Sequence, residues 1–214
     1  TALARLGAYL ADLTAGATTP EAPEGAFIGG AVLLGEGVVI EPGAFIQGPA
    51  IIEAGAQLRQ GCYLRGNTLI GAGAVVGHCS ELKNAVLLPG AKAPHFNYVG
   101  DSILGVKAHI GAGVILSNVR LDKRSVRVAL LCAETAETGG ASATGAAGGG
   151  GAAGGVARPA YLDTGLEKFG ALLGDACEVG CNSVLNPGTI LGARCRVAPV
   201  SRVKGTWAED SALL

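Results

Sequence analysis

An aliphatic side chain recurs at every sixth position through a long part of this chain. The first series contains no polar residue and consists of Ile28, Leu34, Ile40, Ile46, Ile52, Leu58, Leu64, Ile70, Val76, Leu82 and Leu88. Four residues after most of these comes a small or β-branched side chain, namely Val32, Val38, Ala44, Ala50, Ala56, Cys62, Thr68, Ala74, Ser80 and Val86. A repeat at a fixed period outweighs local propensity when an architecture is inferred, and the period here is six.

This period predicts an all-β fold, a left-handed parallel β-helix built from hexapeptide repeats. Each hexad forms one short flat face with a large aliphatic side chain toward the axis, and three faces close one triangular coil. Gly makes up 36 of the 214 residues and aromatic residues only 4%, which favours many tight corners over a large aromatic core.

The hexad register is interrupted twice. It resumes as Tyr98, Leu104, Ile110 and Leu116, and later as Leu173, Val179, Leu185, Leu191, Val197 and Val203. We therefore expect residues 90–97 to bulge outward as a loop. The second interruption is far longer, and its Gly/Ala-rich part, residues 139–155, has a composition typical of a disordered linker.

These boundaries divide the chain into five segments. They are an N-terminal amphipathic helix and linker (1–20), the first part of the β-helix (21–118), an insertion (119–168), the last coils (169–205) and a C-terminal tail (206–214). The helix is predicted from the helical spacing of Leu3, Leu6, Leu10 and Leu13, and we expect it to cap the first coil.

Composition argues against several classes of partner. A formal net charge of -1 and the lack of a basic stripe give no reason to expect a nucleic acid. No apolar run is long enough to predict a membrane-spanning helix, and no signal peptide is recognisable, so we expect a cytoplasmic protein. The cysteines match no secreted or metal-binding spacing, so we expect reduced, small core residues: Cys62, Cys79, Cys132, Cys177, Cys181 and Cys195.

The densest departure from the hexad is ELKNAVLLPGAKAPHFNYVGDSILG, residues 81–105. This segment resembles the acetyltransferase domain of the bifunctional glucosamine-1-phosphate acetyltransferase and N-acetylglucosamine-1-phosphate uridyltransferase family, which are hexapeptide-repeat acyltransferases. The resemblance covers residues 52–118 and 169–203, and AKAPHFNYVGD is its most specific piece. It implies an acetyl-CoA-dependent N-acetyltransferase acting on an amino-sugar 1-phosphate or a related amino sugar.

By this resemblance His95 is the general base that takes a proton from the acceptor amine, work that suits an imidazole because it titrates near neutrality. The residues implied in substrate binding are Arg59, Lys83, Tyr98, His109, Asn118 and Lys123. Ala112 and Cys181 are implied in binding acetyl-CoA, the co-substrate, and Arg202 and Lys204 of the last coils are candidates for its phosphates because of their charge. The family also implies a homotrimer whose pockets are assembled from neighbouring chains.

Three positions depart from the family pattern. His109 replaces an acceptor-binding Asn, Val119 replaces a Tyr, and Cys181 replaces a Ser that assists the acetyl carbonyl. These changes leave the identity of the acceptor open, and they keep an inactive relative among the alternatives.

Other functions compete with this one. The chain could be a nucleotidyltransferase-associated or noncatalytic assembly or regulatory module, although GAFIGGAV belongs to the hexad register and is no phosphate loop. A zinc-dependent hydratase of the γ-carbonic anhydrase type is disfavoured because the three histidines lack the paired spacing of that family. We therefore predict no metal ligands.

Overall fold

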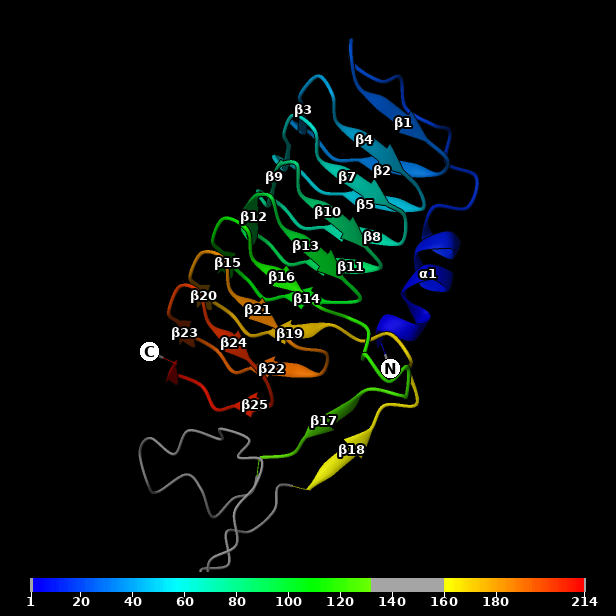
Figure 1. Cartoon of the computed structure of the whole chain (residues 1–214). Coiled ribbons are helices and arrows are strands. Elements are labelled where there is room, and N and C mark those ends of the chain that lie inside the picture. The colour runs from blue at the N-terminus through cyan, green and yellow to red at the C-terminus, as the bar shows by residue number, and fades with distance from the viewer. Residues whose placement is uncertain (1, 132–159, 214) are drawn as a thin grey trace, which may run out of the picture.

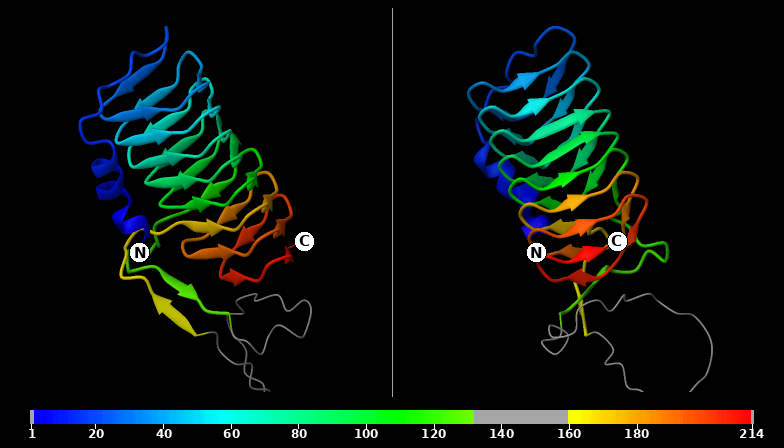
Figure 2. Two further views of the ribbon diagram at one scale, coloured as in Figure 1. Left: turned by 180° about the vertical axis from the view of Figure 1, so that it is seen from behind. Right: turned by 90° about the vertical axis from the view of Figure 1, so that its left-hand side faces the viewer.

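The computed structural model describes residues 2–131 and 160–213 and confirms the left-handed parallel β-helix (Figure 1). Three eight-stranded parallel sheets, here called A, B and C, form the three sides of about nine coils. Successive coils stack along one axis, so each strand pairs with the strand one coil away (Figure 2). Corners where the chain passes from one sheet to the next are named by the two sheets.

The strands are short, and each sheet takes one strand from each of eight coils. Sheet A contains β1 (Phe27–Gly29), β4 (Phe45–Gln47), β7 (Tyr63–Arg65), β10 (Glu81–Lys83), β13 (Tyr98–Gly100), β16 (Ile115–Leu116), β21 (Val184–Leu185) and β24 (Arg202–Val203). Sheet B contains β2 (Val32–Leu34), β5 (Ala50–Ile52), β8 (Thr68–Ile70), β11 (Ala85–Leu87), β14 (Ile103–Leu104), β19 (Ala171–Leu173), β22 (Thr189–Leu191) and β25 (Thr206–Trp207). Sheet C contains β3 (Val39–Ile40), β6 (Gln57–Leu58), β9 (Val75–His78), β12 (Lys92–His95), β15 (His109–Ile110), β20 (Glu178–Val179), β23 (Arg196–Val197) and β26 (Ala212–Leu213).

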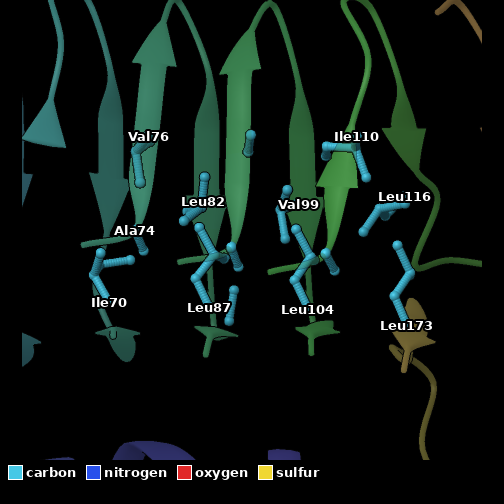
Figure 3. Close-up of a cluster of buried hydrophobic side chains, with 14 of the residues drawn as sticks. Ile70, Ala74, Val76, Leu82, Leu87, Val99, Leu104, Ile110, Leu116 and Leu173 are labelled. Atoms are coloured by element: carbon cyan, nitrogen blue, oxygen red, sulfur yellow. The ribbon is translucent and has the colours of Figure 1, made fainter. Parts of the chain in front are cut away.

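The core is a column of aliphatic side chains along the axis (Figure 3). Most are fully buried, among them Ile46, Ile52, Leu58, Leu64, Ile70, Val76, Leu82, Leu104, Ile110 and Leu116. Burial of one such side chain contributes about 1.5–3 kcal/mol, which makes the column the main source of stability. Close coil-to-coil contact at the corners requires glycine at positions such as Gly48, where an added Cβ would lie 2.3 Å from the carbonyl oxygen of Ala31.

Two coils in the middle of the β-helix are one residue shorter than the coils before them. Strand partners in the coils before them are eighteen residues apart, as in Val32 and Ala50, but Glu81 pairs with Tyr98 and Tyr98 with Ile115, each seventeen residues on. The missing residue falls at the A–B corner, between the core residues Leu82 and Leu87 and again between Val99 and Leu104.

The shortened coils correct three expectations. Leu87 and Val99 face the core in place of Leu88 and Tyr98, which are half-buried, and Ala85 is buried in place of Val86. Residues 90–97 do not bulge as a loop, because β12 continues sheet C between β9 and β15. The apparent insertion at residues 90–97 therefore arose because the six-residue count was carried across an A–B corner where successive core residues are only five apart.

Helix α1 (Ala2–Leu13) lies along the outer face of sheet B and does not cap the first coil (Figures 1 and 2). Its buried residues Leu3, Leu6 and Leu10 pack against outward-facing side chains of that sheet, including Ile51, Leu69 and Val86. Asn84 ties the helix to the A–B corner by donating its amide to the carbonyl oxygen of Leu3 at 3.2 Å. Apolar residues on the outer face of sheet B thus explain the helix position.

The inserted segment continues the cover over sheet B. Val119 bridges to Lys168 where the segment leaves and rejoins the coils, and β17 (Arg127–Ala129) pairs antiparallel with β18 (Tyr161–Asp163). Val126 and Val128 are buried in the same cluster as helix α1. The Gly/Ala-rich stretch 139–155, for which we expected disorder, lies outside the described residues.

The C-terminal segment is part of the β-helix. We expected residues 206–214 to form a tail, but β25 and β26 add to sheets B and C. Arg194 links this last coil to the preceding one through ion pairs with Glu209 at 3.0 Å and Asp210 at 2.7 Å. Within the described ranges, no helix is both long and apolar enough to span a membrane.

Candidate active site

The C–A corner carries a column of functional groups, and backbone hydrogen bonds join six successive coils there. Backbone hydrogen bonds link Cys79 N to Gln60 O, Phe96 N to His78 O, Gly113 N to His95 O, Asn182 N to Ala112 O and Val200 N to Cys181 O. The histidine predicted as the base and two residues predicted to contact acetyl-CoA, Ala112 and Cys181, therefore stand on one edge of the molecule. The order along this edge is His78, His95, Ala112 and Cys181.

His95 ends β12 and is exposed, while its backbone is fixed on both sides. Its N–H donates to Asn97 Oδ1 at 3.0 Å, its carbonyl accepts from Gly113 N at 3.0 Å, and it pairs in register with His78. No group in the described parts of the chain hydrogen-bonds to its imidazole ring. A ring with a fixed backbone and both nitrogens available can exchange a proton with a bound ligand.

The other two histidines are engaged within the chain. His78 Nδ1 lies 3.0 Å from Gln60 O, and its ring meets the edge of Phe96 at 5.3 Å between centroids. His109 lies on the outer face of sheet C, where Nδ1 is 2.8 Å from Glu178 Oε2. His95 is thus the one histidine of three whose ring has no partner among the described residues.

Asn97, buried behind His95, holds this corner in shape. Its side-chain amide donates to Gly111 O at 2.8 Å and Val114 O at 3.3 Å, and its Oδ1 accepts from His95 N. Its own N–H donates to Ser80 Oγ at 3.2 Å. Asn97 therefore joins three coils through its side chain and its backbone N–H, and removing the side chain would leave several buried polar groups unpaired.

Gly77 allows the close approach of the strand that carries His95. An added Cβ there would lie 1.7 Å from Pro94 O, which is backbone and cannot yield as a flexible side chain would. The AKAPHF segment therefore needs a glycine one coil earlier, at the in-register position.

A second polar cluster lies where sheet A meets the A–B corner. Asn118 Nδ2 donates to Asp101 Oδ2 at 2.5 Å and to the Tyr98 hydroxyl at 3.3 Å, and Asn84 Nδ2 donates to Asp101 Oδ1 at 2.8 Å. Burial raises the pKa of the Tyr98 phenol, which therefore stays protonated near neutral pH. Gly100 makes room for this arrangement, because a Cβ there would lie 2.5 Å from the Tyr98 hydroxyl.

Lys83 stands beside this cluster. It ends β10 opposite Gly100 and shares the lining of a groove of about 330 Å³ with Asp101, Lys168 and helix α1. Within the described ranges its ammonium group has no hydrogen-bond or ion-pair partner. The structure thus brings together Tyr98, Asn118 and Lys83 of the predicted substrate-binding residues.

The remaining predicted substrate residues lie elsewhere. Arg59 lies at the C–A corner two coils before His95, and its guanidinium donates to Gln57 Oε1 at 3.1 Å. His109 faces outward from sheet C, and Lys123 is exposed in the inserted segment. Within one chain, the predicted substrate-binding residues therefore lie apart, at the C–A corner, on sheet A, on sheet C and in the inserted segment.

The residues predicted to bind acetyl-CoA also fall into two groups. Ala112 and Cys181 adjoin at the C–A corner, next to His95, while Arg202 and Lys204 are exposed on the outer face of sheet A in the last coils. Both cations lack ion-pair partners in the described structure. Exposed cations of this kind suit phosphate groups, but these two stand on a different face from Ala112 and Cys181.

Two cysteines differ from expectation. Cys62, Cys177 and Cys195 are buried, but Cys79 and Cys181 are exposed because the corner points outward there. All five are free thiols, and Cys132 lies outside the described residues. Burial raises the pKa of Cys62 to about 12 and that of Cys177 to about 11, so both remain thiols.

No role was predicted for Asn97, Asp101 or Ser80, which shape the site from buried positions. Asn97 and Asp101 do occur in AKAPHFNYVGD, but only the coil-to-coil contacts reveal what they hold. In the part of the chain that the structure describes, no group of three or more His, Cys, Asp or Glu residues could hold a metal ion.

Fold and site together define a hexapeptide-repeat left-handed β-helix protein with an outward histidine at one corner. Residues 46–135 match the family model described as the GMPPB C-terminal domain. The β-helix is also similar to part of the proteins named GlmU, which confirms the resemblance found through the AKAPHFNYVGD segment.

Among these relatives, a bifunctional protein GlmU of Methanococcus maripaludis (strain S2) is 35% identical over 79% of this chain and 36% of its own length. The bifunctional sugar-1-phosphate nucleotidylyltransferase/acetyltransferase of Sulfurisphaera tokodaii is 28% identical over 58% of this chain and 24% of its own. The chain spans about a quarter to about a third of the length of these relatives. The solved structure of the polySia-specific acetyltransferase NeuO aligns with a TM-score of 0.46 and 12% identity over 88% of this chain and 77% of that one.

Proposed function

We propose that this chain is an acetyl-CoA-dependent N-acetyltransferase that acts on an amino-sugar 1-phosphate or a related amino sugar, with His95 as the general base. The observation that carries the proposal is the ring of His95, which is exposed, held by a fixed backbone and unpartnered among the described residues. The relatives named as acetyltransferases supply the reaction class.

The coenzyme would supply the acetyl group as a thioester, whose carbonyl carbon the acceptor amine attacks. His95 would take the proton that the amine loses as the C–N bond forms, and would return it to the departing thiolate as the C–S bond breaks. Backbone amides near Ala112 and the Cys181 thiol stand one and two coils away on the same corner, where they can contact the thioester. No covalent enzyme intermediate is needed, because the amine is itself the nucleophile.

Lys83 and Arg59 would hold the acceptor phosphate, and Tyr98 and Asn118 would orient the sugar ring. Lys83, Tyr98 and Asn118 lie together, while Arg59, His109 and Lys123 lie on other faces. This division supports a homotrimer in which faces of neighbouring chains complete each pocket. Sedimentation equilibrium tests that part: a trimer mass is expected, and a monomer at micromolar concentration would contradict it.

The central experiment is an acetyl-CoA-dependent thiol-release assay with glucosamine 1-phosphate, galactosamine 1-phosphate and nucleotide-linked amino sugars. We expect turnover with at least one of these acceptors and none with its N-acetylated form. Because His109 and Cys181 depart from the family pattern, the preferred acceptor need not be glucosamine 1-phosphate.

A nucleotidyltransferase-associated or noncatalytic module is the second candidate. The match to the GMPPB C-terminal domain and the nucleotidylyltransferase named in the Sulfurisphaera tokodaii relative favour it. Calorimetry separates the two functions, because the enzyme must bind acetyl-CoA. Absence of binding at millimolar acetyl-CoA would contradict the acetyltransferase and favour the noncatalytic module.

A further inference from the structure

The inserted segment carries a cavity that acetyl transfer does not use. It has a volume of about 240 Å³, lies beside β17 and β18, and is lined by Arg120, Arg124, Ser125, Arg127 and Asp163. Four of the chain's 16 basic residues fall within residues 120–127. This region lies outside the hexapeptide repeat.

Arg120 is held in place on this wall by a bidentate pair with Asp122. Its Nε lies 2.8 Å from Oδ1 and its Nη2 lies 2.5 Å from Oδ2, and this pair holds the pKa of Asp122 well below the usual range of a carboxyl group. The pairing leaves Nη1 without a bonded partner in the described structure. Arg120 thus keeps a donor for a ligand in a fixed orientation.

The carboxylate in the cavity wall is satisfied by neutral donors. Asp163 accepts from Gly165 N at 2.9 Å and from Ser125 Oγ at 2.8 Å, and these hydrogen bonds lower its pKa. Among the described residues, no arginine of the cavity hydrogen-bonds to this carboxylate. Three guanidinium groups consequently line a small space that contains a single carboxylate.

Arg124 and Arg127 have free donors. The Arg127 guanidinium stacks over the Tyr161 ring at 5.5 Å, which orients it without using its N–H groups. Neither guanidinium makes a hydrogen bond within the described ranges. The backbone beneath them is anchored, because Val126 and Val128 are buried against the cluster that contains helix α1.

We propose that this cavity binds a phosphate group, either as a free anion or as the phosphoryl end of a larger ligand. Guanidinium groups with fixed forks match phosphate oxygens in pairs, and the two carboxylates Asp122 and Asp163 leave the three arginines with a net positive charge that favours an anion. Pockets for whole small molecules span roughly 300–1,000 Å³, so a cavity of about 240 Å³ suits a phosphate or diphosphate better than an entire nucleotide sugar.

The test is calorimetric titration of the full chain with inorganic diphosphate in a phosphate-free buffer of low ionic strength. Arg124→Ala and Arg127→Ala should each weaken binding at least tenfold. Arg5→Ala, which removes an exposed arginine of helix α1, should leave it unchanged. Arg124→Lys keeps the charge without the fork and should give an intermediate loss, and circular dichroism confirms that each variant is folded.

Two further titrations distinguish the sources of the phosphate and the two proposals. The affinities for coenzyme A and dephospho-coenzyme A show whether the 3′-phosphate of coenzyme A occupies the cavity. If it does, the wild type binds coenzyme A more tightly than dephospho-coenzyme A, and Arg124→Ala reduces that difference in affinity. His95→Ala should bind diphosphate as well as the wild type does, whatever its acetyltransferase activity. Absence of diphosphate binding, or equal weakening by Arg124→Ala and Arg5→Ala, would overturn the phosphate site.

Discussion

His95 and His78 are in-register partners on adjacent strands of sheet C, yet only the ring of His78 is bonded within the described chain. The same corner position thus serves two purposes in successive coils. Gln60 and Phe96 fix the His78 ring as part of the wall, and the His95 ring is left to face solvent. This contrast separates a structural histidine from a candidate base without reference to any relative.

The shortened coils make a prediction about the core. Leu87→Ala should lower the free energy of unfolding by about 2–5 kcal/mol, because Leu87 is fully buried and a cavity would remain. Leu88→Ala, the matched control, should cost only about 1 kcal/mol because Leu88 is half-buried. Urea unfolding measures both free energies of unfolding. A larger decrease for Leu88→Ala than for Leu87→Ala would show that Leu88 faces the core, as the uninterrupted hexad register predicts.

Asn97 should matter for both stability and the placement of His95. Asn97→Ala removes the acceptor for His95 N and the donor to Gly111 O, so the free energy of unfolding should fall by about 2–4 kcal/mol. Gln47→Ala removes an amide on the exposed outer face of sheet A and should change it by less than about 0.5 kcal/mol. Equal effects of the two substitutions in denaturant would show that Asn97 is no anchor.

Alkaline pH should destabilise the fold partly through Cys62. Burial, assisted by the negative charge of Glu41, raises the pKa of its thiol from 9.0 to about 12. The unfolded chain loses this proton first as the pH rises above 9, so the contribution is fully present below pH 9 and is lost between pH 9 and 12. Cys62→Ala should therefore show a shallower decline in unfolding free energy between pH 8.5 and 10.5.

The comparison of the wild type with Cys62→Ala measures the contribution of the Cys62 thiol alone. The buried Cys177 thiol, whose pKa is also raised, contributes to the pH dependence of both proteins. Parallel declines in the wild type and the variant would mean that the Cys62 thiol ionises equally in the folded and unfolded chains.

The hexad pattern predicted the fold because each face must bury one aliphatic side chain, and that requirement is visible at fixed spacing. It failed where two neighbours are both apolar, as with Leu87 and Leu88, because hydrophobicity alone cannot say which one turns inward. The position of helix α1 was equally hidden, since the apolar outer face of sheet B is formed by residues such as Ile51 and Leu69 that flank the hexad positions.

For the site, the sequence identified His95 through a local motif, but it could not identify partners distant in the chain. His109 Nδ1 lies 2.8 Å from Glu178 Oε2, on the far side of the inserted segment in the sequence, and Asn118 donates to Asp101 from the next coil. Both contacts depend on how coils stack, which a linear spacing does not record. The same holds for the arginine cavity, whose wall joins residues 120–127 to Asp163.

The most direct test of the central claim is the rate of acetyl transfer by His95→Ala, measured by thiol release with the best acceptor. We expect kcat to fall by about 10²–10⁴-fold, because a general base contributes on that scale, while the unfolding transition stays close to that of the wild type. Lys107→Ala, an exposed cation at the B–C corner, should retain full activity. Wild-type kcat in folded His95→Ala would contradict the assignment of His95 as the base.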